Sequence, residues 1–127
     1  MKITIKGNPI TKKNSQRIVL IGGRPRIIPS KNFKDYEARA AIYMPKLEKP
    51  IDYGVNVKCL YYMETHRRVD LVNLIEATHD ILVKYGVLED DNSLIVWSVD
   101  GSRVLYSKTD PRTEIEITPI IPKEKEE

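Results

Sequence analysis

Residues 67–92 read RRVDLVNLIEATHDILVKYGVLEDDN, and this stretch contains the strongest fold signal in the chain. At about 100° per residue, helical spacing places seven of its side chains in one stripe that would face a core. They are Leu71, Leu74, Ile75, Thr78, Ile81, Leu82 and Tyr85. Asp70 stands where a helix N-cap belongs and Gly86 where a C-cap belongs. The stretch therefore predicts one buried helix that begins after Asp70 and ends before Gly86.

Carboxylates surround this helix. Asp70 precedes it, Glu76 and Asp80 lie along it, and the acidic run at 89–91 follows the glycine turn. Hard divalent cations take oxygen ligands, and basic residues beside the acids suggest a polyanionic substrate. A structural interpretation is also open, in which Asp70 only caps the helix, Asp80 faces solvent and the acidic run is a polar turn. However, acids at the helix cap, along the helix edge and at the entrance of the next strand could converge on one point. Such a group of carboxylates favours metal-dependent cleavage of a phosphodiester.

The stretch resembles the RusA family of Holliday-junction resolvases, small endonucleases of bacteria and their phages. The family motif is Asp-x-Asp-Asn-x-x-Lys, then a further Asp, a Gly turn and Asp-Asp. It aligns without a gap on residues 70–76, Asp80, Gly86 and residues 90–91. Segments 7–14 and 29–36 also resemble the family, so the likeness covers most of residues 1–118. It implies a homodimer that resolves four-way or branched DNA by paired symmetric cuts in recombination and repair, in a phage or prophage setting. It also implies Mg²⁺ as cofactor, with Mn²⁺ as a substitute.

Two positions depart from the family pattern. Val72 replaces the second acid, and Glu76 replaces the Lys. Residues at i and i+4 are neighbours on a helix, so Glu76 can reach toward the place of the missing carboxylate. Our hypothesis is that Asp70, Glu76 and Asp91 form the catalytic and metal-binding set, with Asp90 as a further metal ligand. The alternatives are a branched-DNA-binding protein that has lost its metal site, and a small phage protein that acts through protein partners.

Charge is divided unevenly along the chain. Residues 1–39 carry ten Lys or Arg and two acids, net +8, whereas residues 40–127 carry eleven and sixteen, net −5, which together give the overall +3. Phosphate neutralisation by basic side chains is the main source of affinity for nucleic acid. The candidate DNA-binding residues are Lys12, Lys13, Asn14, Arg17, Arg24, Arg26, Lys31, Arg67, Arg68 and Asn73. Each alone suits an ordinary surface position, and the absence of a base-reading motif favours recognition of backbone shape.

Composition restricts the class of protein. A length of 127 residues predicts one domain. One cysteine excludes an internal disulfide, and two histidines argue against a structural zinc site. The sequence contains neither an apolar run of about 18 residues nor the apolar core of a signal peptide. We therefore expect a cytoplasmic protein.

Periodicity and turn residues predict the other elements. These are strands at 2–6, 53–63, 93–99, 103–107 and 113–117, a hairpin at 17–28 around Gly22-Gly23, and a helix at 31–44. The order of the elements predicts an α+β fold, a mixed β-sheet packed by two α-helices in a single RusA-like domain. That domain is expected to span residues 1–118, with residues 119–127 as a disordered charged tail.

Overall fold

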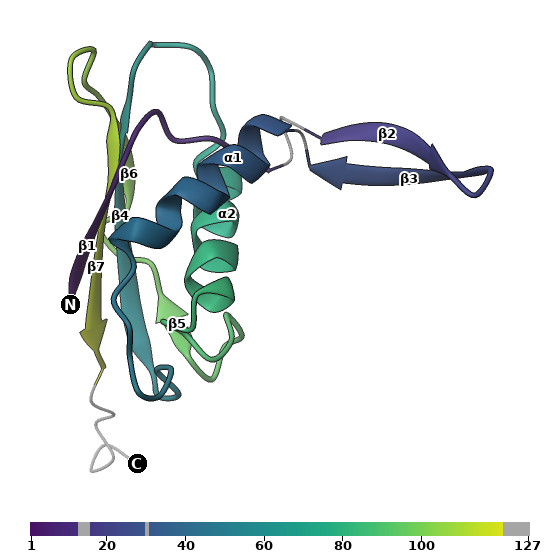
Figure 1. Cartoon of the computed structure of the whole chain (residues 1–127). Coiled ribbons are helices and arrows are strands. Elements are labelled where there is room, and N and C mark those ends of the chain that lie inside the picture. Colours follow the sequence, from purple (N-terminus) through teal and green to yellow (C-terminus); the bar gives the residue numbers. More distant parts are fainter. Residues whose placement is uncertain (13–15, 30, 121–127) are drawn as a thin grey trace.

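Two helices lie against one face of a mixed β-sheet in the computed structural model, which describes residues 1–12, 16–29 and 31–120 (Figure 1). The elements are β1 (Lys2–Lys6), β2 (Gln16–Ile21), β3 (Arg24–Pro29), α1 (Lys31–Ala40), the 3-10 turn η2 (Ala41–Tyr43), β4 (Val55–Met63), α2 (Leu71–Lys84), β5 (Val96–Ser98), β6 (Arg103–Tyr106) and β7 (Arg112–Pro119). The expected α+β class, with a mixed sheet and two helices, is confirmed. Within the described residues, no helix is long and apolar enough to cross a lipid bilayer.

The main sheet places the last strand in its interior. Its order is β1-β7-β4-β5, and β6 also pairs with β4. Ile115 of β7 is opposite Ile3 of β1 on one side and Cys59 of β4 on the other, both antiparallel. β5 and β6 both run parallel to β4, β5 beside its first residues and β6 beside its last four. Sequence periodicity predicts the strands but not their order in the sheet.

Buried hydroxyl pairs join the helices to the sheet. The hydroxyl of Tyr61 on β4 lies 2.7 Å from that of Thr78 on α2, whose Oγ1 also donates to the carbonyl of Leu74. The hydroxyl of Tyr36 on α1 lies 3.1 Å from that of Thr113 on β7. Burial raises the pKa of Tyr36 to about 12. Each of these four buried hydroxyls thus has a hydrogen-bond partner, as a packed core requires.

Local signals set the ends of two elements as expected. The Asp70 carboxylate caps α2 by accepting a hydrogen bond from the backbone N–H of Val72 at 3.2 Å. Gly86, with a φ of +74°, ends the same helix. Gly22 and Gly23 have φ values of +60° and +78°, which suit the two central positions of a tight hairpin turn.

Two elements are much shorter than expected, whereas β4 and β6 differ from their expected ranges by only one or two residues. The first helix ends at Ala40 rather than near residue 44, because Met44 must be extended before Pro45 and has φ −84° and ψ 133°. The strand expected at 93–99 is confined to Val96–Ser98. Asn92 holds the preceding residues in a turn, since its side-chain oxygen accepts from the N–H of Leu94 at 2.9 Å.

The C-terminal end of the sheet extends beyond the expected strand. β7 continues to Pro119, and the N–H of Ile120 donates to the carbonyl of Gly54 at 2.9 Å. Residues 121–127, most of the expected tail, lie outside the described residues.

Candidate functional site

The candidate metal ligands lie at the start of α2, in its middle and in the turn that follows it. Asp70 is exposed and caps the helix, and Glu76 is half-buried one turn beyond Val72. Asp90 and Asp91 lie in an exposed turn after Gly86. In that turn Asp90 accepts hydrogen bonds from the N–H of Asp91 at 2.8 Å and from the amide of Asn92 at 3.2 Å. The turn thereby has a defined local shape.

The expected trio does not form a cluster of three ligands. Among residues 1–12, 16–29 and 31–120, no three His, Cys, Asp or Glu side chains are grouped so that they could hold a metal ion. The chemistry of the donors does suit Mg²⁺, because all are carboxylates and Asp70 and Asp91 are exposed. The metal-binding role of Asp70, Glu76, Asp91 and Asp90 therefore stays a prediction.

An ion pair brings the first loop against α2. Nζ of Lys12 lies 3.1 Å from Oδ2 of Asp80, and the two side chains are 37% and 34% exposed. Asp80 follows Glu76 by four residues, so these two acids are neighbours on one side of the helix. The loop residue next to Lys12, Thr11, is buried. Lys12, one of the predicted DNA-binding residues, is thus held beside the acidic edge of α2.

His79 is a buried residue that the sequence analysis did not select. Only 8% of it is exposed, and its Nε2 atom has no hydrogen-bond partner among the residues that the structure describes. Burial lowers the pKa of His79, and the charges of Asp91 and Asp80 oppose that effect. The opposition shows that the turn carrying Asp91 lies within electrostatic range of α2. A sequence signal existed, because His79 lies about 40° around the helix from Ile75 of the core stripe.

A basic pocket lies in front of the first turn of α2. Its volume is about 370 Å³, and its lining residues are Asn8, Pro9, Ile10, Thr11, Met63, Thr65, Arg67, Arg68 and Val69. The side-chain oxygen of Asn8 accepts from the N–H of Glu64 at 2.9 Å, which joins the first loop to the segment before α2. The pocket thus gathers Arg67 and Arg68 next to Asp70.

The other predicted DNA-binding residues are spread more widely. Arg24 and Arg26 are exposed on β3, Lys31 is exposed at the start of α1, and Asn73 is half-buried on α2. Arg17 lies in β2. Lys13 and Asn14 lie outside the described residues.

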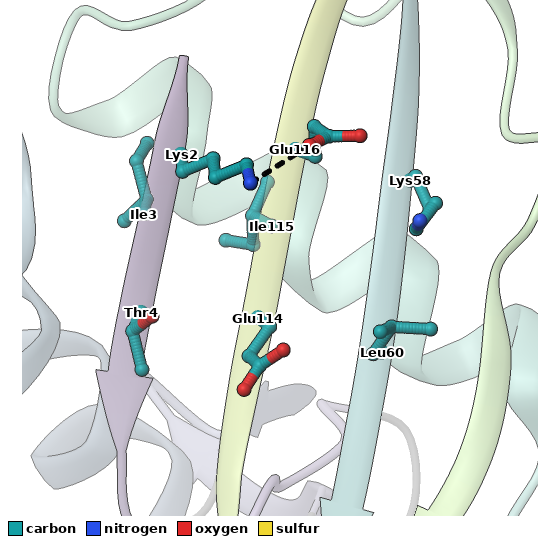
Figure 2. A pocket seen from close by; sticks show the side chains of 8 residues that line it. All are labelled: Lys2, Ile3, Thr4, Lys58, Leu60, Glu114, Ile115 and Glu116. Atoms are coloured by element: carbon teal, nitrogen blue, oxygen red, sulfur yellow. Dashed lines mark ion pairs between the residues drawn. The ribbon is translucent and has the colours of Figure 1, made fainter.

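A second, smaller pocket lies on strands β1, β7 and β4, away from these residues. Figure 2 shows its lining, in which Lys2 forms an ion pair with Glu116 at 3.6 Å. Its volume is about 160 Å³, and it contains Lys58 and Glu114 besides that pair. Opposite charges balance there, and none of the predicted site residues lines it, so we assign the candidate site to α2.

Comparison with known proteins assigns a family to the chain. The family model for endodeoxyribonuclease RusA matches residues 6–118 of the 127. No curated protein matches the chain. The family match includes the capped helix, the acidic turn and the basic pocket, and it covers most of the sequence. The chain therefore belongs to the RusA family of endodeoxyribonucleases.

Proposed function

We propose that this protein is a structure-selective endodeoxyribonuclease that resolves Holliday junctions and other branched DNA by paired symmetric cuts. It would act as a homodimer in recombination and repair, in the cytoplasm of a bacterial or phage-infected cell. A two-fold dimer presents two equivalent sites, which suits two symmetric cuts. The observation that carries the proposal is the position of Asp70. It directly follows Val69, a lining residue of the pocket that contains Arg67 and Arg68.

The phosphate contacts follow from this arrangement. Arg67 and Arg68 offer guanidinium groups to a DNA phosphate at the pocket, and guanidinium can donate two parallel hydrogen bonds to one phosphate. Lys12, which follows the pocket residue Thr11, is anchored on Asp80. Neither contact reads a base, so the duplex would be recognised through its backbone.

The carboxylates supply the cleavage chemistry. Asp70, Glu76 and Asp91 would hold Mg²⁺, or Mn²⁺ in its place, with Asp90 adjacent. Such an ion lowers the pKa of a bound water and stabilises charge on the scissile phosphate. Glu76 lies four residues beyond Val72, where the family has its second acid, and we infer that it contributes the carboxylate that Val72 lacks.

A second candidate function is binding of branched DNA without cleavage. Two observations favour it. Val72 is 67% exposed at the first turn of α2, and its side chain has no oxygen to offer a metal. The described residues also include no group of three metal ligands.

A cleavage assay separates the two functions. A labelled four-way junction and a linear duplex of the same sequence are incubated with excess protein and Mg²⁺, Mn²⁺ or EDTA. We expect paired nicks in the junction that require metal and disappear in Asp70→Asn. Junction binding without nicks under either metal would establish the non-catalytic function instead.

A further inference from the structure

The hairpin of β2 and β3, residues Gln16–Pro29, extends away from the body of the protein as an arm (Figure 1). It forms a two-stranded sheet of its own, separate from the main sheet. Six residue pairs, from Gln16 with Pro29 to Ile21 with Arg24, hold it together. An isolated two-stranded hairpin is marginally stable in water, so a partner that covers the arm would stabilise it.

The pairing register separates the residues of the arm into two faces. Directly paired residues share a face, and successive residues alternate between faces. Leu20 therefore shares a face with its partner Pro25, and Ile21 shares the other with Arg24. Two positions further along, the register pairs residues 18 and 27 at positions that correspond to the face of Leu20, and Arg26 falls on the face of Arg24. We call these the apolar face and the arginine face.

Charge indicates the chemistry of the partner. Residues 16–29 contain three arginines and no acid, and the register places all three at positions of the arginine face. Arg24 and Arg26 are exposed. Because only cations are present, the matching surface is a polyanion.

The root of the arm lies near the candidate site. The chain enters the arm shortly after Lys12, which is anchored on Asp80, and leaves it into α1 at Lys31. At the tip, Leu20 and Ile21 are 75% and 57% exposed. The arm thus starts beside the acidic edge of α2, and its tip is exposed to solvent.

We propose that the arm binds a second duplex of branched DNA, its arginine face along the phosphates and its apolar face toward bases at the branch point. This inference rests on the proposed function and adds to it the part of the chain that distinguishes a junction from a linear duplex. Apolar side chains can enter gaps between base steps, which a branch point opens. A linear duplex on the body offers the arm no second set of phosphates.

Binding in EDTA tests the proposal without cleavage. The wild-type protein, an Arg24→Gln/Arg26→Gln variant and a Lys2→Gln/Lys58→Gln control are titrated with a four-way junction and with linear duplex at several salt concentrations. The control removes the same charge from the open face of the sheet. We expect the arginine variant to bind the junction about tenfold more weakly, with a salt slope smaller by about two, and duplex affinity to be unchanged.

The apolar face needs a separate variant. A 2-aminopurine base at the branch point should change its fluorescence when wild-type protein binds, and this change should decrease in Leu20→Ser. Sedimentation of the same variant without DNA tests whether a second copy of the chain, rather than DNA, covers the apolar face. A loss of dimer in Leu20→Ser would show that a second copy of the chain covers this face and would overturn the proposal.

Other outcomes are also decisive. Equal weakening on duplex and junction would make the arm a general phosphate contact, and unchanged junction binding would remove the arm from the interface. Either result would refute the inference while the wild-type preference for junctions upheld the proposed function. A wild-type protein with no such preference would refute both.

Discussion

Nζ of Lys12 lies 3.1 Å from Oδ2 of Asp80, and this ion pair joins residues that are 68 positions apart in the chain. Both side chains are about one-third exposed, so solvent screens the attraction and its contribution to stability is small. Its main effect is positional, because it fixes the first loop beside α2. The arm and the basic pocket both adjoin that loop.

Loss of this anchor should affect activity more than stability. We expect Asp80→Asn to change the free energy of unfolding by less than about 1 kcal/mol. Cleavage of a four-way junction should fall roughly tenfold, because a misplaced loop misaligns the phosphate. Glu116→Gln is the matched control, since it breaks the Lys2 ion pair on the open sheet face. Denaturant unfolding and a nicking assay measure the two effects, and equal losses in both variants would contradict the prediction.

Two substitutions of Asp70 separate its cap from its proposed metal-binding role. Asparagine caps a helix about as well as aspartate, so Asp70→Asn should keep the hydrogen bond from the Val72 N–H and the stability. Asp70→Ala should lose about 1 kcal/mol. We expect neither variant to nick DNA. Urea denaturation and the junction assay provide the readouts, and an Asp70→Asn protein that still cuts would disprove the metal-binding role.

The proposal that Glu76 supplies the carboxylate missing at Val72 can be tested by moving the carboxylate back to position 72. Glu76→Gln should lower junction cleavage by roughly tenfold or more, because it removes a metal-binding carboxylate. Adding Val72→Asp to that variant should restore cleavage, since Val72 is 67% exposed and can be replaced without loss of core packing. The affinity for Mn²⁺, measured by calorimetric titration, should likewise fall in Glu76→Gln and recover when Val72→Asp is added.

Glu48→Gln is the control for these variants, because Glu48 is exposed and lies outside the site. If Glu76→Gln behaves like Glu48→Gln in both assays, Glu76 has no part in the metal site.

Buried His79 should make stability depend on pH. Burial lowers its pKa, so the unfolded chain binds a proton near the ordinary value of 6.5 and the folded protein binds it only at lower pH. The unfolded state therefore gains protons first, and stability decreases as the pH falls from about 6.5 toward the lowered pKa.

His79→Leu removes this component and also the unpartnered Nε2 atom. We expect the variant to be about 1 kcal/mol more stable at neutral pH and to lose less stability at pH 5. Urea unfolding in EDTA at pH 5, 6, 7 and 8 measures the difference. Parallel curves for wild type and variant would show that His79 does not titrate in this range.

Gly54 lies under the only tryptophan of the chain. A Cβ atom at Gly54 would lie 2.6 Å from Cδ2 and Nε1 of Trp97, so Gly54→Ala must displace the ring. Overpacking of this kind costs about 1 to 3 kcal/mol. We expect that loss of stability together with red-shifted emission, because the ring is 46% exposed and can move outward. In a Trp97→Ala background the same substitution should cost little, as a double-mutant cycle will show.

Local signals in the sequence were sufficient for much of this fold. The Asp70 cap, the Gly86 end and the Gly22-Gly23 turn each depend on residues within a few positions of one another, and the structure has all three. The shortened strand β5 also has a local cause, the turn that Asn92 holds. The predicted strand begins at Ser93, but the turn that Asn92 holds continues through residues 93–95.

The candidate site depended more on long-range contacts. The family motif identified the acids, but no local pattern pairs Lys12 with Asp80 or brings Asp91 within range of His79. Those contacts form only when the first loop and the acidic turn pack on α2. Burial of a histidine is also hard to predict, because imidazole suits both core and surface positions, and the place of His79 near the core stripe is the one local signal for its burial.

The interior position of β7 has a consequence for synthesis of the protein. β1 leaves the ribosome first, yet it pairs with β7, and β7 is the last strand of the described chain to be made. Until about residue 119 has emerged, β1 lacks its neighbour and β4 has one open side. Such non-local pairing delays folding. A nascent chain therefore cannot complete its sheet, and we expect nuclease activity to appear only after translation has passed β7.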